Sequence, residues 1–156
     1  MSAAAYVRCA VAWGSVATTD PDLGTGPLRA VRTGRHACFD RVVLEVDGPA
    51  GGKSATYVPV VRQDGSGAPL TVPGGARLQI ALHHPSYDDA GRPTYSAAPP
   101  DVRGYPAYGS VVFGGSFEGY TTIGVGTRAR LPYRRFTLDG GPDGPSRIVL
   151  DVAPRW

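Results

Sequence analysis

The chain lacks the long apolar runs of membrane-spanning proteins. Among its 156 residues, no stretch approaches the roughly 18 consecutive apolar residues that a spanning helix needs. The chain has no asparagine and one lysine, Lys53, so scattered arginines carry most of its net charge of +3. No block of basic residues with interleaved aromatics is present, which argues against a nucleic-acid partner. Helical stripes with capping residues are also missing, so a helical fold is not expected.

Short alternating segments separated by turn residues are the dominant pattern. The 22 glycines and 15 prolines follow no period and lie between the apolar runs, where turns belong. Val42, Leu44 and Val46 fall on one face of a half-buried strand, and Pro59 predicts an edge strand or a bulge. Strands are predicted over 41–47, 57–61, 70–72, 77–83, 110–113, 119–125, 133–138 and 147–152. Several short strands at this spacing are typical of an all-β sandwich or barrel.

Two segments interrupt this pattern. Residues 1–26 are expected to form an irregular arm that packs on a domain formed by residues 27–156. Residues 83–108 are rich in proline and tyrosine and do not alternate, and so long a loop in a compact domain is usually functional or disordered. Its aromatic residues argue against disorder and suit sugar rings or a partner protein. Packing of the loop onto the sandwich is the open alternative for these tyrosines, which are Tyr87, Tyr95, Tyr105 and Tyr108.

The two cysteines, Cys9 and Cys38, bear on the compartment. An even count in a loop-rich chain favours one disulfide and an oxidising compartment, with two buried free thiols as the alternative. The N-terminus does not resemble a signal peptide, because Arg8 breaks its apolar run and no basic region precedes it. We expect a secreted or cell-surface protein whose leader is absent from this sequence, rather than a cytoplasmic one.

Five blocks of the sequence resemble one known family. They are Cys9 with Trp13-Gly14-Ser15, and the segments 31–41, 91–95, 116–119 and 147–152. Together they resemble the AMIN-like domain-containing (lipo)proteins of actinobacteria over nearly the whole chain, although the lipobox of a lipoprotein is missing. That family is named for the AMIN domain, a β-sandwich that targets cell-wall amidases and secretins to the envelope and is thought to bind peptidoglycan. The resemblance implies a β-sandwich of two packed, mostly antiparallel sheets and export, and it does not imply amidase activity.

Three motifs resemble metal, dinucleotide or nucleophile sites, and each falls short. The histidines at 83–84 with the aspartates at 88–89 are the single metal-like cluster, but adjacent residues at a strand end point to opposite faces and zinc needs three or four ligands. Residues 124–129 match a dinucleotide fingerprint, yet a strand follows where a helix is required. Ser116 misses the nucleophile elbow because Glu118 replaces the second glycine. No catalytic residue, metal or cofactor is therefore predicted.

The block 35–41 is the densest polar feature of the sequence. One interpretation is ligand contact through Arg35, His36 and Arg41, because guanidinium forks suit the carboxylates of wall peptides and uronic polymers. The other interpretation is structural, with Asp40 paired to a neighbouring arginine and Cys38 in the disulfide.

These observations favour a non-catalytic, exported envelope module that binds cell-wall glycan or peptidoglycan. Two alternatives stay open. One is a protein-interaction or assembly module with a protein partner or as a homodimer. The other is a small β-barrel enzyme or small-molecule binder, which requires a deep pocket lined by titratable groups.

Overall fold

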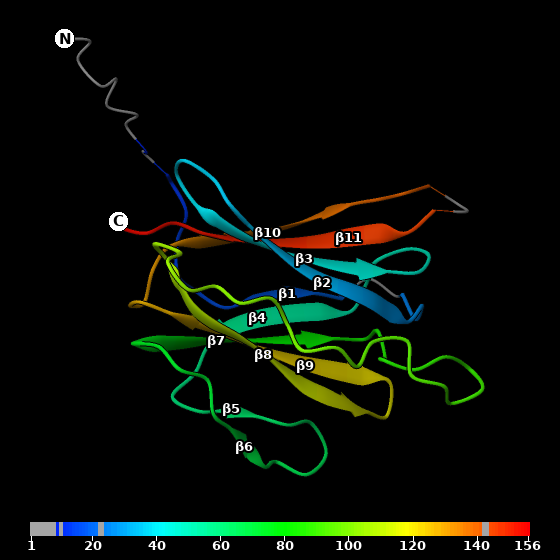
Figure 1. The fold of residues 1–156 in the computed structure, drawn as a ribbon. Coiled ribbons are helices and arrows are strands. Elements are labelled where there is room, and N and C mark those ends of the chain that lie inside the picture. The colour runs from blue at the N-terminus through cyan, green and yellow to red at the C-terminus, as the bar shows by residue number, and fades with distance from the viewer. Residues whose placement is uncertain (1–8, 10, 22–23, 142–143) are drawn as a thin grey trace, which may run out of the picture.

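The computed structural model describes residues 9, 11–21, 24–141 and 144–156, which form strands and no helix. Two large antiparallel sheets pack face to face, and a small hairpin lies outside one of them (Figure 1). The prediction of an all-β sandwich is therefore confirmed. No helix in the described part of the chain is long and apolar enough to cross a membrane.

Both large sheets combine strands that lie far apart in the sequence. The five-stranded sheet has the order β1 (Thr18–Asp20), β4 (Lys53–Tyr57), β7 (Ala76–Leu82), β9 (Tyr120–Thr127) and β8 (Tyr108–Phe117). The four-stranded sheet has the order β10 (Tyr133–Leu138), β11 (Ser146–Val152), β3 (Asp40–Val46) and β2 (Leu28–Arg35). The outer hairpin pairs β5 (Val61–Arg62) with β6 (Pro69–Leu70). Every pairing between neighbouring strands is antiparallel.

The hydrophobic core lies between the two large sheets. Alternate residues of a strand point to opposite faces, so β3 directs Val42, Leu44 and Val46 inward, each at most 1% exposed. The facing residues of the other sheet include Leu78, Ile80 and Leu82 of β7 and Ile123 and Val125 of β9. The period-two pattern of the sequence therefore identifies the core face of β3 and β7 correctly.

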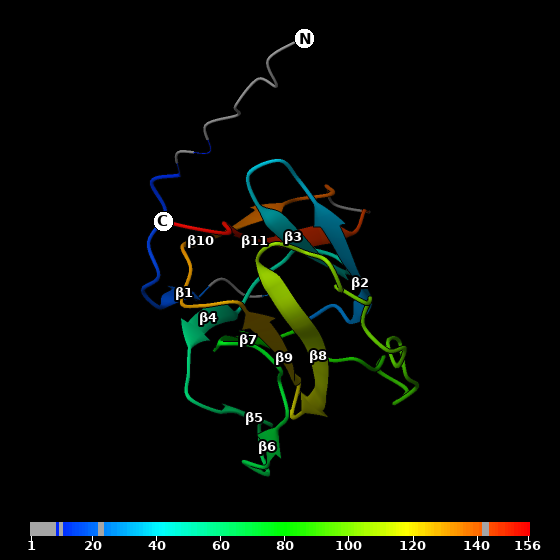
Figure 2. The ribbon, with the colours of Figure 1, turned by 60° about the vertical axis from the view of Figure 1, so that its left-hand side comes forward.

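An irregular loop, residues 83–107, closes the open side of the sandwich between β2 and β8 (Figure 2). The Leu28 N–H of β2 donates to the Pro85 carbonyl at 2.8 Å. The Ser86 N–H donates to the Ser116 hydroxyl of β8 at 2.9 Å. The loop is therefore bonded to the edge strands of both sheets.

The N-terminal arm closes the opposite side, between β4 and β10. The arm contains β1, a strand that the sequence does not predict and that pairs with β4. Tyr133 of β10 donates its N–H to the Gly14 carbonyl and its hydroxyl to the Val16 carbonyl, at 2.9 and 2.6 Å. The disulfide between Cys9 and Cys38 ties the arm to the β2–β3 turn, which confirms the predicted pairing.

The β5–β6 hairpin lies over the outer face of the five-stranded sheet (Figure 1). Glycines permit this approach, since a Cβ on Gly124 would lie 2.6 Å from the Val72 side chain and a Cβ on Gly114 would lie 2.6 Å from Leu70. The strand predicted over 57–61 is wrong. β4 ends at Tyr57, and the chain bends through Pro59 before β5 begins.

Candidate functional site

An open groove crosses the outer face of the five-stranded sheet, beside the hairpin. It consists of three hollows of about 260, 370 and 420 Å³. Ala81 and Tyr120 line both the first and the second hollow, and Gln63 and Asp64 line both the second and the third. A ligand pocket typically measures about 300–1,000 Å³, so the first hollow is smaller than this range and the other two are near its lower end. The continuous groove therefore suits an extended ligand better than one compact small molecule. We call it the outer groove.

Small side chains form the floor of the outer groove. Thr19, Ser54, Ala81 and Thr122 are register partners across β1, β4, β7 and β9, so they point to the same face in one row. Three of the four carry a hydroxyl, which both donates and accepts hydrogen bonds. Gln79 lines the second hollow beside this row. The floor therefore consists of short side chains that can form hydrogen bonds with the hydroxyl groups of a ligand.

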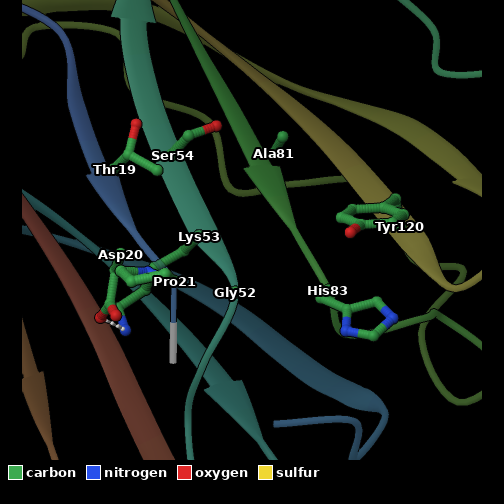
Figure 3. Close-up of a pocket in the computed structure, with 9 residues that line it drawn as sticks. All are labelled: Thr19, Asp20, Pro21, Gly52, Lys53, Ser54, Ala81, His83 and Tyr120. Atoms are coloured by element: carbon green, nitrogen blue, oxygen red, sulfur yellow. Dashed lines mark hydrogen bonds and ion pairs between the residues drawn. The ribbon is translucent and has the colours of Figure 1, made fainter. Parts of the chain in front are cut away.

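Two stacked rings stand at one side of the first hollow (Figure 3). The His83 and Tyr120 ring centroids are 4.6 Å apart, with the ring planes inclined by 28°. Tyr120 is 42% exposed although it begins a central strand. Its partner across the β8–β9 turn, Phe117, is 46% exposed and lines the third hollow. These exposed rings offer apolar faces beside the polar groups of the groove.

The β8–β9 turn that presents these rings has an unusual backbone. Glu118 has φ of 48° and Gly119 has φ of 83°, the positive values that a two-residue hairpin turn requires. Glu118 is the one non-glycine residue with positive φ in the described part of the chain. The tight turn places Phe117 and Tyr120 opposite each other.

The opposite side of the first hollow carries an ion pair. Lys53 of β4 donates to the Asp20 carboxylate of β1 (Figure 3). The Lys53 side chain is 2% exposed and that of Asp20 is 21% exposed. Arg135 of β10 lies 3.8 Å from the same carboxylate. The pair therefore joins the arm to both sheets.

Two of the four tyrosines predicted as ligand contacts are buried in the core. Tyr108 is 3% exposed, and its hydroxyl donates to the Leu150 carbonyl at 2.9 Å. Tyr95 is 8% exposed and packs edge-on against Phe113, and its hydroxyl has no hydrogen-bond partner among the described residues. Burial raises the pKa of both hydroxyls. Neither ring has a free face for a surface ligand.

The other two loop tyrosines are half-buried. The Tyr87 hydroxyl accepts the Gly119 N–H at 3.2 Å, and the Tyr105 hydroxyl bonds to Thr33 at 3.2 Å. These bonds attach the loop to the β8–β9 turn and to β2. These contacts account for the placement of both side chains without a ligand. Ligand binding by Tyr87 and Tyr105 stays a prediction.

Arg35, His36 and Arg41 do not converge on one point. The Arg35 guanidinium lies over the Tyr105 ring, and the exposed His36 ring stacks on Phe39 with centroids 4.7 Å apart. Arg41 instead belongs to an ion pair on the outer face of the four-stranded sheet. A shared contact of these three residues with one ligand stays a prediction.

The expected pairing of Asp40 with a neighbouring arginine is wrong. Its buried carboxylate accepts the N–H groups of Ala107 and Tyr108, at 2.6 and 3.2 Å. Arg41 pairs with Asp151, at 2.7 Å. Asp40 and Arg41 are adjacent in a strand and therefore point to opposite faces, so Asp40 fixes the end of the 83–107 loop.

The AMIN-like domain family matches residues 26–154. The chain belongs to this family. The match spans β2 to β11 and leaves out β1 and the rest of the arm. It confirms the resemblance found in the sequence and associates the protein with the cell envelope. Comparisons with curated proteins and with solved structures found no match.

The two adjacent histidines of this AMIN-like domain occupy different environments. His83 lines the outer groove, whereas His84 is fully buried. His84 Nδ1 donates to the Gly26 carbonyl at 2.7 Å, and Nε2 accepts the Gly51 N–H at 3.0 Å. Only a neutral imidazole can make both bonds. Burial, and to a lesser degree Lys53 and His83, lower the pKa of His84 below its ordinary 6.5.

We expect the AMIN-like domain to lose stability as the pH falls below 6.5. The folded state holds His84 neutral, while the unfolded chain takes up a proton near the ordinary pKa, so acid favours unfolding. Urea unfolding of the parent and of His84→Gln, measured across this range, checks the effect. The parent should show the steeper loss, and His36→Gln, an exposed-histidine control, should follow the parent. Equal slopes in the parent and His84→Gln would contradict the assignment.

Ser116 has no histidine partner in the described part of the AMIN-like domain. Its hydroxyl contacts the hydroxyls of Ser86, at 2.8 Å, and Thr121. Both ring nitrogens of the nearby His84 are engaged by backbone groups. A serine nucleophile requires an adjacent base, and this geometry offers none, so Ser116 acts in loop attachment.

Proposed function

We propose that this AMIN-like domain is a non-catalytic, exported module that binds cell-wall glycan in the outer groove. The observation that carries the proposal is the exposed Tyr120 ring, stacked on His83, beside a row of mostly hydroxyl-bearing side chains. Sugar rings have apolar C–H faces that pack on aromatic rings, and hydroxyl groups that pair with Ser, Thr and Gln side chains. Family membership, which associates the domain with the envelope, supports the same ligand class.

The shape of the outer groove supports a polymer rather than a small molecule. The hollows are open to solvent and connected through shared residues. A glycan chain lying along the groove would contact Tyr120 near its centre, because that residue lines two hollows.

We expect Tyr120→Ala to weaken binding to cell wall by at least about tenfold. Truncating an aromatic anchor at the centre of a binding site costs roughly 2 kcal/mol or more, and 1.4 kcal/mol corresponds to tenfold in affinity. Co-sedimentation with purified cell wall, washed free of protein and anionic polymer, measures the affinity. Trp156→Ala is the matched control, because Trp156 is an aromatic side chain 70% exposed outside the groove.

Two results would overturn the groove as the binding site. One is a parent protein that does not sediment with the wall. The other is a Tyr120→Ala variant that binds as tightly as Trp156→Ala. A Tyr87→Phe, Tyr105→Phe variant in the same assay tests the loop tyrosines separately. If this double variant loses cell-wall binding and Tyr120→Ala does not, the binding site lies at the loop.

A further inference from the structure

The outer face of the four-stranded sheet carries a different set of side chains from the outer groove. Strand register places its outward residues in three rows across β10, β11, β3 and β2. The rows are Arg134-Asp151-Arg41-Gly34, Phe136-Val149-Val43-Arg32 and Leu138-Arg147-Glu45-Ala30. Four arginines and two carboxylates share this face, so it has an excess of two positive charges. We call it the arginine face.

Two of its arginines are held in place from several sides. Asp151, with a fully buried side chain, accepts from Arg41 Nε and Nη2 at 2.7 and 2.9 Å and from Arg134 Nε at 2.8 Å. The rings of Phe39 and Phe136 each lie 5.1–5.4 Å from both guanidinium groups. One carboxylate therefore serves two guanidinium groups and leaves one positive charge uncompensated.

The fixed guanidinium of Arg134 keeps hydrogen-bonding capacity. Its side chain is 41% exposed, and neither Nη atom has a hydrogen-bond partner among the described residues. Trp13 of the arm covers it from one side, with the ring centroid 4.5 Å from the guanidinium carbon. A guanidinium that is already oriented loses less conformational freedom when it binds an anion.

The two remaining arginines extend the positive charge over the sheet. The Arg32 side chain is 60% exposed and reaches Glu45 only at 3.5 Å. Arg147 is exposed and forms no ion pair with a residue that the structure describes. Adjacent strands lie about 4.8 Å apart, so the four arginines present guanidinium groups at several points across the face. A ligand with repeated anionic groups would match them better than a single ion.

The outer groove lacks this excess. Its charged lining consists of Asp20 and Asp64 against Lys53 and Arg62, with His83. The carboxylates and cationic side chains balance there, which suits an uncharged glycan. The two outer faces of the sandwich therefore differ in the charge of the ligand that they favour.

We propose that the arginine face binds a polyanion, an acidic polymer with repeated phosphodiester or carboxylate groups, at a second site. Guanidinium forks bond both groups in a bidentate manner. Contact with several charges of one polymer releases counterions, so affinity should fall steeply with salt. This site does not depend on the outer groove, so both ligands can bind the domain together.

Titration of the intact protein with defined polymers tests the proposal. The probes are linear polyphosphate and polygalacturonate, with dextran as the neutral control, each at low and at physiological salt. We expect binding to at least one polyanion and none to dextran. The polyanion that binds with the higher affinity shows whether the face favours phosphate or carboxylate groups. Arg32→Gln, Arg147→Gln should weaken polyanion binding about tenfold and reduce its salt dependence. Arg92→Gln, Arg155→Gln removes the same charge from exposed arginines elsewhere and should bind like the parent.

Three results would overturn the arginine face as a site. The first is no binding to either polyanion. The second is equal weakening in the two double variants, which would mean that net charge alone attracts the polymer. The third is a Glu45→Gln variant that binds no tighter than the parent, because this change removes a carboxylate from the face and should strengthen binding. Tyr120→Ala should leave polyanion binding intact, which separates failure here from failure of the glycan site.

Discussion

We expect Asp20→Ala to lower the free energy of unfolding by about 3–5 kcal/mol, the usual cost of breaking a buried ion pair by removing one partner. The variant leaves Lys53, 2% exposed, with its charge buried and its Asp20 partner gone. Arg135, with a side chain 10% exposed, also lies near the lost carboxylate. Urea unfolding of the parent and the variant measures the loss.

Two further variants separate the ion pair from other effects of the substitution. Asp20→Ala, Lys53→Met removes both charges, and it should lose clearly less stability than Asp20→Ala alone, because no unpaired lysine remains. Asp101→Ala breaks the pair with Arg103, whose side chain is 91% exposed, and it should change stability far less, since solvent screens exposed pairs. A double variant as unstable as the single one would show that Asp20 acts through something other than Lys53.

The sequence predicts the central strands of this fold because their pattern is local. Alternation in β3, β7 and β11 identifies the inward residues without any knowledge of their neighbours, and Val42, Ile80 and Leu150 are each at most 2% exposed. In such strands one face meets the other sheet and the opposite face meets solvent, so hydrophobicity repeats every two residues.

β4 and β1 escape prediction because their inward residues depend on distant partners. β4 begins at Lys53, a charged residue on the core side, and this breaks the expected alternation. Lys53 can face inward only because Asp20 of β1 meets it there. The three residues of β1 are too few to form a periodic pattern, and they become a strand by pairing with the edge of β4.

The candidate site is only partly visible in the sequence. Tyrosines and prolines draw attention to the 83–107 loop, yet ring exposure depends on tertiary packing, and Tyr95 and Tyr108 pack inward. Tyr120 does carry a signal. Thr121, Ile123 and Val125 lie an odd number of residues after Tyr120 in the same strand, so they point to the opposite face. Ile123 and Val125 belong to the core, so the Tyr120 ring points to the outer face. The neighbouring hairpin and the stacked His83 are long-range features that no local pattern encodes.

Removing the disulfide is expected to cost about 3–4 kcal/mol of stability on the chain-entropy model, given a sequence separation of 29 between Cys9 and Cys38. The crosslink restricts the unfolded chain, so its loss favours unfolding while the folded sheets keep their own contacts. The Cys9→Ser, Cys38→Ser variant and the parent in reductant should therefore lose similar amounts in urea unfolding. Thiol counting on the unreduced parent should find no free thiol.

The folded state should tolerate this loss because other contacts hold the arm. Tyr133 bonds the backbone of Gly14 and Val16, and Arg130 donates to the Ser15 hydroxyl and carbonyl at 3.0 and 3.1 Å. We therefore expect the serine variant to retain the parent's circular dichroism and its sedimentation with cell wall in the absence of denaturant. Reductant should not destabilise the variant further. A variant with unchanged stability would mean that the crosslink does not constrain the unfolded chain, and two reactive thiols in the parent would contradict the export proposal.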